Sequence, residues 1–277
     1  MSEMIFKVEN VGYWYPGGEA ALRDIGFSVR AGESVAILGA NASGKSTLLH
    51  LLDGLYFADH GRIEAFGTPL TEQAVETSPF SREFRRKVGY LFQNSDAQLF
   101  CATVEEELAF GPLQLRLPRD EVERRIDDTA RMLGIEHLLE RYPQSLSGGE
   151  KKKVALAGVI SCGPSVILLD EPSAGLDPRT QQWLTEFMGA LRQSGVTLIT
   201  SSHDLSLVAD VSRRVLILSE DQRLIYDGPV ADALTDLDLL LSANLIHAHA
   251  HVHDGKVHAH PHLHEIWHEH GHGGVES

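Results

Sequence analysis

Apolar residues gather in short runs along the first part of the chain, and their spacing predicts strands followed by a helix. Such runs cover Met4–Glu9, Ile25–Val29 and Ser34–Leu38. The third run enters a glycine-rich loop, after which leucines recur three and four residues apart within 46–52. This periodicity is that of a helix. The opening of the chain therefore predicts the order strand, glycine loop, helix.

Apolar runs alternate with helical patterns in the second half of the chain. Strands are predicted at Val88–Phe92, Val166–Leu169, Val196–Ser201 and Val215–Leu218, and helices at Gly149–Ile160, Thr180–Gln193 and Leu205–Ala209. Strands that alternate with helices are typical of a parallel sheet covered on both faces. We therefore expect an α/β fold.

A helical pattern interrupts this alternation. Apolar residues lie three and four apart within Thr103–Leu139, and we expect Pro112 and Pro118 to break the helix there. The whole region from about 94 to 146 is interpreted as a helical lobe inserted into the α/β domain.

Composition changes abruptly after Asn244. Eleven of the fifteen histidines lie between His247 and His272, among mostly small and acidic residues. Such a segment has too little apolar pattern for a core. We expect one domain over residues 1–243 and a His-rich tail, disordered or ordered by metal, over 244–277.

Charge and cysteine content narrow the function classes. The chain of 277 residues has a net charge of −15, and a surface that binds nucleic acid needs clustered Lys and Arg, so we expect no nucleic-acid partner. Two cysteines, Cys101 and Cys162, do not suggest a disulfide framework, which fits a reducing cytoplasm. No signal peptide and no membrane span are expected from the sequence.

The strongest motif is the glycine loop between the third strand and the first helix. It comprises Gly39, Ala40, Asn41, Ala42, Ser43, Gly44, Lys45 and Ser46. Glycines allow the backbone N–H groups to surround phosphates, and the helix that follows adds its positive end. We expect Lys45 to reach the β- and γ-phosphates, Ser46 to ligate Mg²⁺, and Thr47 to contact the α-phosphate side.

Two acids follow the apolar run Val166–Leu169. A buried parallel strand delivers such side chains to the carboxyl edge of the sheet, where ligands bind. We expect Asp170 to hold Mg²⁺ and Glu171 to polarise an attacking water. Phosphoryl transfer depends mainly on positioning and charge stabilisation, which these residues suit.

A third segment lies shortly before the acidic strand: Leu146, Ser147, Gly148, Gly149 and Glu150. With the glycine loop and the acidic strand, it makes the chain resemble the ATP-binding cassette family from about Ile5 to about Ala233. The resemblance implies an ATPase with a RecA-like parallel-sheet core, an antiparallel β subdomain and a helical lobe. It also implies ATP and Mg²⁺ as ligands.

The resemblance assigns further roles. Gln93 matches the glutamine that senses Mg²⁺ and the γ-phosphate and links to the helical lobe. His203 matches the histidine that contacts the γ-phosphate, and Asp177 matches the residue that couples the two nucleotide sites. Tyr15 matches the aromatic residue that stacks on adenine, with Tyr13 as the alternative.

Within this family, Ser147, Gly148 and Gly149 complete the ATP pocket of a second subunit. The residues themselves agree with an anion site, because they begin a predicted helix. A plain helix cap would explain the same local pattern. The resemblance implies that two ATPase subunits, identical or closely related, hold two ATP molecules between them.

The residues after Gln93 are similar to those of the ATPases of energy-coupling factor importers. The matching segments are Gln93–Phe100 and Thr103–Pro112, although Ser95 and Ala97 replace a proline and an acidic residue common in that subfamily. These importers take up vitamins and transition-metal ions. Because neutral imidazole suits Ni²⁺ and Co²⁺, the histidine tail favours nickel or cobalt as cargo and as a tail ligand.

The resemblance implies partners in a membrane. We expect a transmembrane coupling subunit and a substrate-binding membrane subunit, with this chain peripheral at the cytoplasmic face of the cell membrane. Two alternatives remain open at this point: a vitamin importer of the same type, and a soluble cassette ATPase that clamps a macromolecule.

Overall fold

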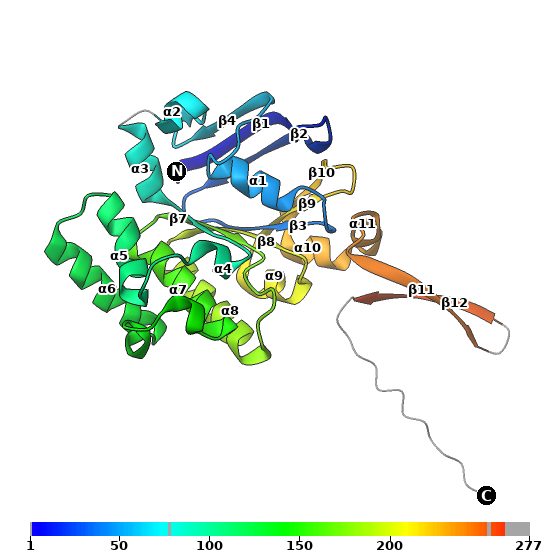
Figure 1. Cartoon of the computed structure of the whole chain (residues 1–277). Helices are drawn as coiled ribbons and strands as arrows, with labels where there is room; N and C mark the ends of the chain where they lie inside the picture. The colour runs from blue at the N-terminus through cyan, green and yellow to red at the C-terminus, as the bar shows by residue number, and fades with distance from the viewer. Residues whose placement is uncertain (1, 77–78, 254–255, 264–277) are drawn as a thin grey trace, which may run out of the picture.

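The structure is a computed structural model that describes residues 2–76, 79–253 and 256–263 (Figure 1). Its central sheet has six strands in the order β10-β9-β3-β8-β7-β6, of which only β10 is antiparallel to its neighbour. The strands are β3 (Ser34–Leu38), β6 (Val88–Leu91), β7 (Val166–Asp170), β8 (Thr197–Ser202), β9 (Arg214–Leu218) and β10 (Leu224–Pro229). The expected α/β class is therefore confirmed.

Continuous apolar runs explain why the central strands lie inside. Every residue of β3, β7 and β8 is buried, as expected of parallel strands with both faces covered. Their parallel pairing places Leu38, Asp170 and Ser202 at one edge of the sheet. This edge carries the segments in which the sequence predicted phosphate chemistry.

A second, antiparallel sheet covers one side of the first helix (Figure 1). Its order is β2-β1-β4-β5, with β1 (Met4–Trp14), β2 (Ala20–Arg30), β4 (His60–Ala65) and β5 (Thr68–Pro69). Phe6, Ile25, Leu48 and Val35 belong to one buried cluster that joins this sheet, the first helix and β3. The antiparallel β subdomain implied by the family resemblance is thus present.

The helices surround the central sheet and build the lobe at the lower left of Figure 1. They are α1 (Lys45–Leu52), α2 (Glu72–Glu76), α3 (Phe80–Lys87), α4 (Ser95–Gln98), α5 (Val104–Gln114), α6 (Arg119–Leu133), α7 (Gly148–Ser161), α8 (Pro178–Gln193), α9 (Leu205–Val211), α10 (Val230–Thr235) and α11 (Leu237–Ser242). A second buried cluster joins α5, α6, α7 and α8 to β7.

The expectation that Pro112 breaks a helix was wrong, whereas Pro118 does stand at a helix boundary. Pro112 lies inside α5, and Pro118 is the N-cap residue of α6. A proline inside a helix cannot donate to the carbonyl four residues earlier, here that of Leu108. The hydroxyl of Ser161 donates to that Leu108 oxygen at 2.9 Å. A contact from α7 therefore satisfies the carbonyl that Pro112 leaves without a helical donor.

The first part of the predicted His-rich tail lies within the described residues. Strands β11 (Ile246–His253) and β12 (Lys256–Leu263) form an antiparallel hairpin of their own (Figure 1). The alternation of histidine with small or apolar residues has the period of a strand, which explains the pairing. The rest of the predicted tail, residues 264–277, lies outside the described residues.

The buried core continues slightly past the predicted domain boundary. Leu245 and Ile246 pack in a third cluster with residues of α10, α11 and β9. The division at residues 243 and 244 stays a prediction. Among the described residues, none of the helices has the length and apolar character that a bilayer crossing requires.

Candidate nucleotide site and signature surface

The carboxyl edge of the central sheet borders a cleft of about 480 Å³. Side chains and backbone from six separate segments of the chain line it. The lining residues are Tyr15, Glu19, Ala20, Ala21, Asn41, Ala42, Gly44, Lys45, Ser46, Thr47, Gln93, Glu171, His203 and Gln222. Most of the residues that the sequence singled out for a nucleotide therefore share one cleft.

The glycine loop leaves the amino end of α1 open. Gly44 is its N-cap residue with φ +98°, and no side chain caps the helix. A Cβ atom at Gly44 would collide with the carbonyl oxygen of Ala21. The hydroxyl of Ser43 is buried and has no hydrogen-bond partner among the described residues. These features fit a loop whose N–H groups donate hydrogen bonds to phosphate oxygens.

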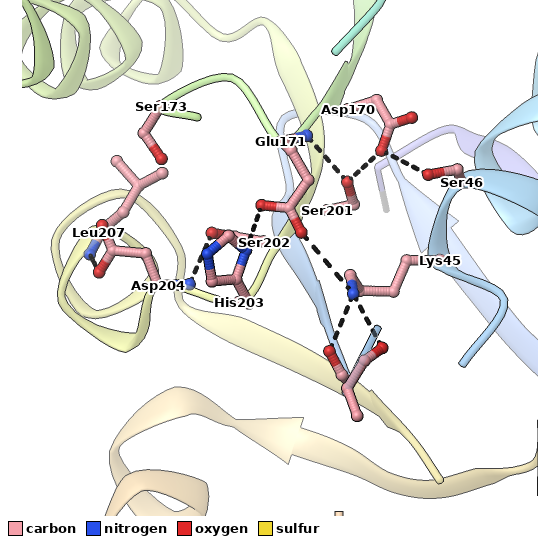
Figure 2. Close-up of polar contacts among 12 residues, drawn as sticks. Lys45, Ser46, Asp170, Glu171, Ser173, Ser201, Ser202, His203, Asp204 and Leu207 are labelled. Carbon is pink, nitrogen blue, oxygen red and sulfur yellow. Dashed lines mark hydrogen bonds and ion pairs between the residues drawn. The ribbon is translucent and has the colours of Figure 1, made fainter. Parts of the chain in front are cut away.

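Lys45 is buried at the floor of this loop. Its Nζ donates to the carbonyl oxygens of Gly39 at 2.9 Å and Ala40 at 3.1 Å, and lies 3.7 Å from Glu171 Oε1. Burial lowers the pKa of Lys45, and the carboxylates of Glu171 and Asp170 oppose that change. The ammonium group is thus held where the glycine loop and the acidic strand meet (Figure 2).

Asp170 accepts hydrogen bonds from three hydroxyls. Ser46 and Ser201 donate to Oδ1 at 3.0 and 2.5 Å, and the Tyr90 hydroxyl lies 3.4 Å from Oδ2 (Figure 2 draws the two serines). Burial and the neighbouring Asp170 raise the pKa of Tyr90, so it remains a donor. Hydroxyl and carboxylate oxygens are ligands that Mg²⁺ prefers, so the donor set of Ser46 and Asp170 fits that ion.

Glu171 is held in an unusual backbone conformation with φ +42°. Its N–H lies 3.0 Å from Ser201 Oγ and 3.2 Å from Ser201 O, and its side chain is buried. His203 Nδ1 lies 2.8 Å from Glu171 Oε2 (Figure 2). Non-glycine residues with positive φ are uncommon and often occur at functional sites. The geometry aims one Glu171 oxygen at Lys45 and the other at His203.

The two candidate aromatic residues have different surroundings. Tyr15 lines the cleft, is 38% exposed, and its hydroxyl lies 2.7 Å from Thr47 Oγ1. Tyr13 instead packs against the core and stacks on Tyr56 with ring centroids 5.4 Å apart. Only Tyr15 of the two presents a face at the cleft.

Gln93 lines the cleft and also connects to the helical lobe. It follows β6, and its carbonyl oxygen accepts a 2.9 Å hydrogen bond from Lys152 Nζ of α7. Lys152 is buried, and burial lowers its pKa. Two further contacts, Lys151 with Asp96 at 2.6 Å and Gln98 with the Ala155 carbonyl at 3.2 Å, join the same segments. No local pattern marks Lys152 for this role, because its partner lies 59 residues away in the chain.

The segment Ser147–Glu150 lies in a separate cleft of about 680 Å³. This signature cleft, as we call it, also includes Lys153, Asp177 and Arg179. Ser147 caps α7, and Asp177 caps α8 by accepting from the N–H groups of Arg179 and Thr180. The structure therefore does not bring Ser147, Gly148, Gly149 or Asp177 into the lining of the nucleotide cleft of the same chain.

Four lining residues of the nucleotide cleft were missed by the sequence reasoning. Glu19 directly precedes β2, Ala20 and Ala21 begin it, and Gln222 lies in the turn between β9 and β10. The Arg23 N–H donates to the Gln222 carbonyl at 2.9 Å, which brings that distant turn to β2. No local pattern in the sequence marks Gln222 for this position.

The sequence and the fold of this chain are similar to those of known proteins. The sequence profile of the ABC transporter family matches residues 22–174. A putative ABC transporter ATP-binding protein of Methanosarcina acetivorans is 51% identical over 97% of this chain and 98% of its own length. The nickel import ATP-binding protein NikO of Rhodobacter capsulatus is 47% identical over 87% of this chain and 95% of its own.

Two further matches bear on the subfamily. The energy-coupling factor transporter ATP-binding protein EcfA of Methanothermobacter thermautotrophicus is 38% identical, covering 87% of this chain and 76% of its own length. The structure of CbiO1 from Clostridium perfringens, part of the ABC transporter complex CbiONQ, has a TM-score of 0.75 and 34% identity. It covers 88% of this chain and 95% of that one.

The chain belongs to the ABC transporter family. It is an ATP-binding subunit whose ATPase activity is coupled to transport. The resemblance to the ATPases of energy-coupling factor importers is confirmed by these relatives.

Proposed function

We propose that this chain is the ATP-hydrolysing subunit of an energy-coupling factor importer for a transition-metal ion, Ni²⁺ or Co²⁺. The observation that carries the ATPase part is the meeting of Lys45, Glu171 and His203 within hydrogen-bond or ion-pair distance at one cleft. The metal cargo is supported by the nickel import protein among the relatives and by the histidine tail.

ATP fits the nucleotide cleft in one orientation. The open amino end of α1 and Lys45 provide positive charge for the phosphates, and Tyr15 provides an exposed ring for the adenine. Ser46, Gln93 and Asp170 are the residues that would hold Mg²⁺. Bound there, Mg²⁺ would supply charge that neutralises the β- and γ-phosphate oxygens.

Hydrolysis depends on the orientation of one water. Glu171 has a buried carboxylate whose two oxygens are fixed between Lys45 and His203. A carboxylate in such a position can accept a hydrogen bond from the attacking water and take up its proton. His203, half exposed at the cleft, holds the carboxylate and offers its other ring nitrogen to the γ-phosphate.

Two copies are required in this proposal because the signature cleft is a second phosphate site away from the first. Gly148 supports this interpretation. A Cβ atom at this position would meet no heavy atom of the described residues within 4 Å. Packing inside one chain therefore does not require glycine at this position. Close approach of the ATP held by a second copy, with Asp177 beside it, would require it.

A membrane partner has a candidate surface beside the helical lobe. A cleft of about 420 Å³ lies between α3 and α5, where Arg82, Arg85 and Phe110 line it. Phe100 and Phe110 are exposed and pack edge to face with centroids 4.8 Å apart. Glu107 fixes the Phe100 loop by accepting from the Phe100 and Cys101 N–H groups.

This surface adjoins the segment that follows Gln93. A helix of a transmembrane coupling subunit docked there would move with the helical lobe when two ATPase subunits close. The coupling subunit would in turn carry a substrate-binding membrane subunit. In this arrangement the chain is peripheral at the cytoplasmic face of the membrane.

The histidine tail is proposed to bind Ni²⁺ or Co²⁺ as a store or sensor. In the hairpin, His247, His249 and His251 pair in register with His262, His260 and His258. Imidazole nitrogen is a good ligand for both ions. Equilibrium dialysis of the full chain against each ion, with and without glutamine at these six positions, tests this part separately from transport.

The proposed function is tested by radiometal uptake in cells that express the chain with its membrane subunits. We expect uptake of Ni²⁺ or Co²⁺ that the Glu171→Gln variant abolishes. Glu123→Gln, the same change on exposed α6, is the matched control and should transport normally. A complex that assembles and hydrolyses ATP but takes up neither ion would exclude the metal cargo and favour a vitamin. A chain that never joins membrane subunits would favour the soluble clamp.

A further inference from the structure

The amino end of α7 is already occupied by a carboxylate of the same chain. Glu150 Oε2 accepts from the Ser147 N–H at 2.8 Å and from the Ser147 hydroxyl at 2.7 Å. The Ser147 Oγ in turn lies 3.4 Å from the Glu150 N–H, which completes a capping box. The Ser147 hydroxyl, a donor that a phosphate would need at this helix end, is therefore engaged by Glu150.

The charge of that carboxylate persists at neutral pH. The hydrogen bonds from Ser147 hold the pKa of Glu150 below its ordinary range, against the effect of partial burial. A γ-phosphate that approaches Ser147 from a second copy also carries negative charge. Two like charges at one helix end repel each other, and both need the same donors.

We propose that Glu150 competes with the γ-phosphate of the partner's ATP for Ser147, and thereby sets the ATP concentration at which two copies close. This inference rests on the proposed two-copy function. Closure requires the carboxylate to turn away from the Ser147 hydroxyl. Glu150 is then a positioning residue that opposes closure at low ATP.

The surroundings supply partners for both anions. Arg141 lies near enough to lower the pKa of Glu150, so a cationic group is available to a carboxylate that leaves Ser147. Lys153 and Arg179 line the signature cleft and remain for the phosphate. When the phosphate replaces the carboxylate at Ser147, each of the two anions therefore has a cationic neighbour.

A capping role alone would not depend on the charge of residue 150. Glutamine completes a capping box as glutamate does. The Glu150→Gln variant therefore keeps the cap and removes only the charge, which separates competition from helix stability. Glu150→Ala, which removes both, provides a second variant if the first folds poorly.

The experiment measures ATP-dependent dimerisation by light scattering of the full chain in the Glu171→Gln background, where hydrolysis is blocked. We expect Glu150→Gln to lower the half-saturating ATP concentration by about fivefold, the effect of one unit-charge repulsion at about 4 Å in water. This difference should shrink as salt rises from 0.05 to 0.5 M. ATP binding to the monomer should not change. Glu123→Gln, on α6, is the matched charge control.

The failures of the two proposals are distinguishable. If the Glu171→Gln parent stays monomeric at saturating ATP, the two-copy function itself fails. If the parent dimerises and Glu150→Gln needs as much ATP or more, Glu150 does not oppose closure and the inference is wrong. A decrease that also appears in Glu123→Gln, or that does not respond to salt, overturns it as well.

Discussion

The amino ends of α1 and α7 both follow segments rich in glycine and serine, but they differ in how they are capped. At α1, Gly44 leaves the amino end without a side-chain cap, and Lys45 lies buried beside it. At α7, Ser147 and Glu150 cap each other in an exposed position. The first end has no side-chain cap, whereas Ser147 and Glu150 satisfy each other at the second.

The surroundings of glycine differ between the two helix ends. Gly44 needs its positive φ and would otherwise collide with the Ala21 carbonyl, so the fold of this chain requires it. Gly148 has open space and no such conformation. The space beside Gly148 is therefore open to close approach by a second copy. Under the proposed function, one chain completes the site at α1, whereas the site at α7 needs a second copy.

The largest effect is expected from Gly148→Val. A side chain at this position should block the partner's ATP while leaving the fold intact, because a Cβ there would meet no heavy atom of the described residues within 4 Å. We expect ATP hydrolysis to fall on the order of 100-fold, as when a transition-state donor is lost. Phosphate release measures it. Gly189→Val in α8, another position where a Cβ meets nothing within 4 Å, should retain activity.

Lys45→Ala should weaken the binding of ATP at the amino end of α1. Loss of a charged hydrogen-bond donor costs about 1.5–3 kcal/mol, so ATP should bind about 10- to 100-fold more weakly to the single chain. Titration calorimetry measures this affinity. Gly148→Val, by contrast, should bind ATP normally, and equal losses in the two variants would remove the distinction between the two ends. Lys7→Ala, in an exposed ion pair, is the control.

Lys152 tests the connection between the two regions. Its Nζ joins α7 to the Gln93 carbonyl, and Lys152→Met keeps the length of the side chain but loses that donor. We expect kcat for ATP to fall about threefold to tenfold with little change in KM, since a net hydrogen bond contributes about 1 kcal/mol. Lys151→Met, whose partner Asp96 is exposed, should change kcat less. An equal loss in both variants would argue against a specific connection.

The change with the smallest expected effect on ATP turnover concerns the far end of α1. Asp53 is buried at the carboxyl end of this helix, and burial raises its pKa to about 7, opposed by Arg85 at 3.1 Å. Its folded pKa exceeds the unfolded value of about 3.9, so this contribution to stability is complete below about pH 4 and lost as pH rises through 7.

Asp53→Asn should therefore remove part of the pH dependence of unfolding. Between pH 5 and 8, the wild type should lose more stability than the variant in urea titrations. Asp96→Asn, which changes an exposed carboxylate, should keep the wild-type slope. A wild-type slope in Asp53→Asn would show that Asp53 does not titrate in this range.

Local patterns accounted for much of the fold and of the nucleotide cleft. Continuous apolar runs predicted β3 and β7 because a strand buried on both faces has no polar alternation. The strand β4 and helices such as α3 were not predicted. The prediction at Pro112 was wrong because the carbonyl that this proline leaves without a helical donor, that of Leu108, accepts from the Ser161 hydroxyl of α7. Ser161 lies 53 residues after Leu108, so no local pattern shows this contact.

The sequence by itself determined the glycine loop, the acidic strand end and the signature segment, because each is a contiguous run whose chemistry depends on its own spacing. Only the tertiary structure decided that Glu171 lies between Lys45 and His203, that Lys152 reaches Gln93, and that the signature segment faces a separate cleft. These contacts join residues far apart in the chain, and packing of the sheet and the helical lobe brings them together.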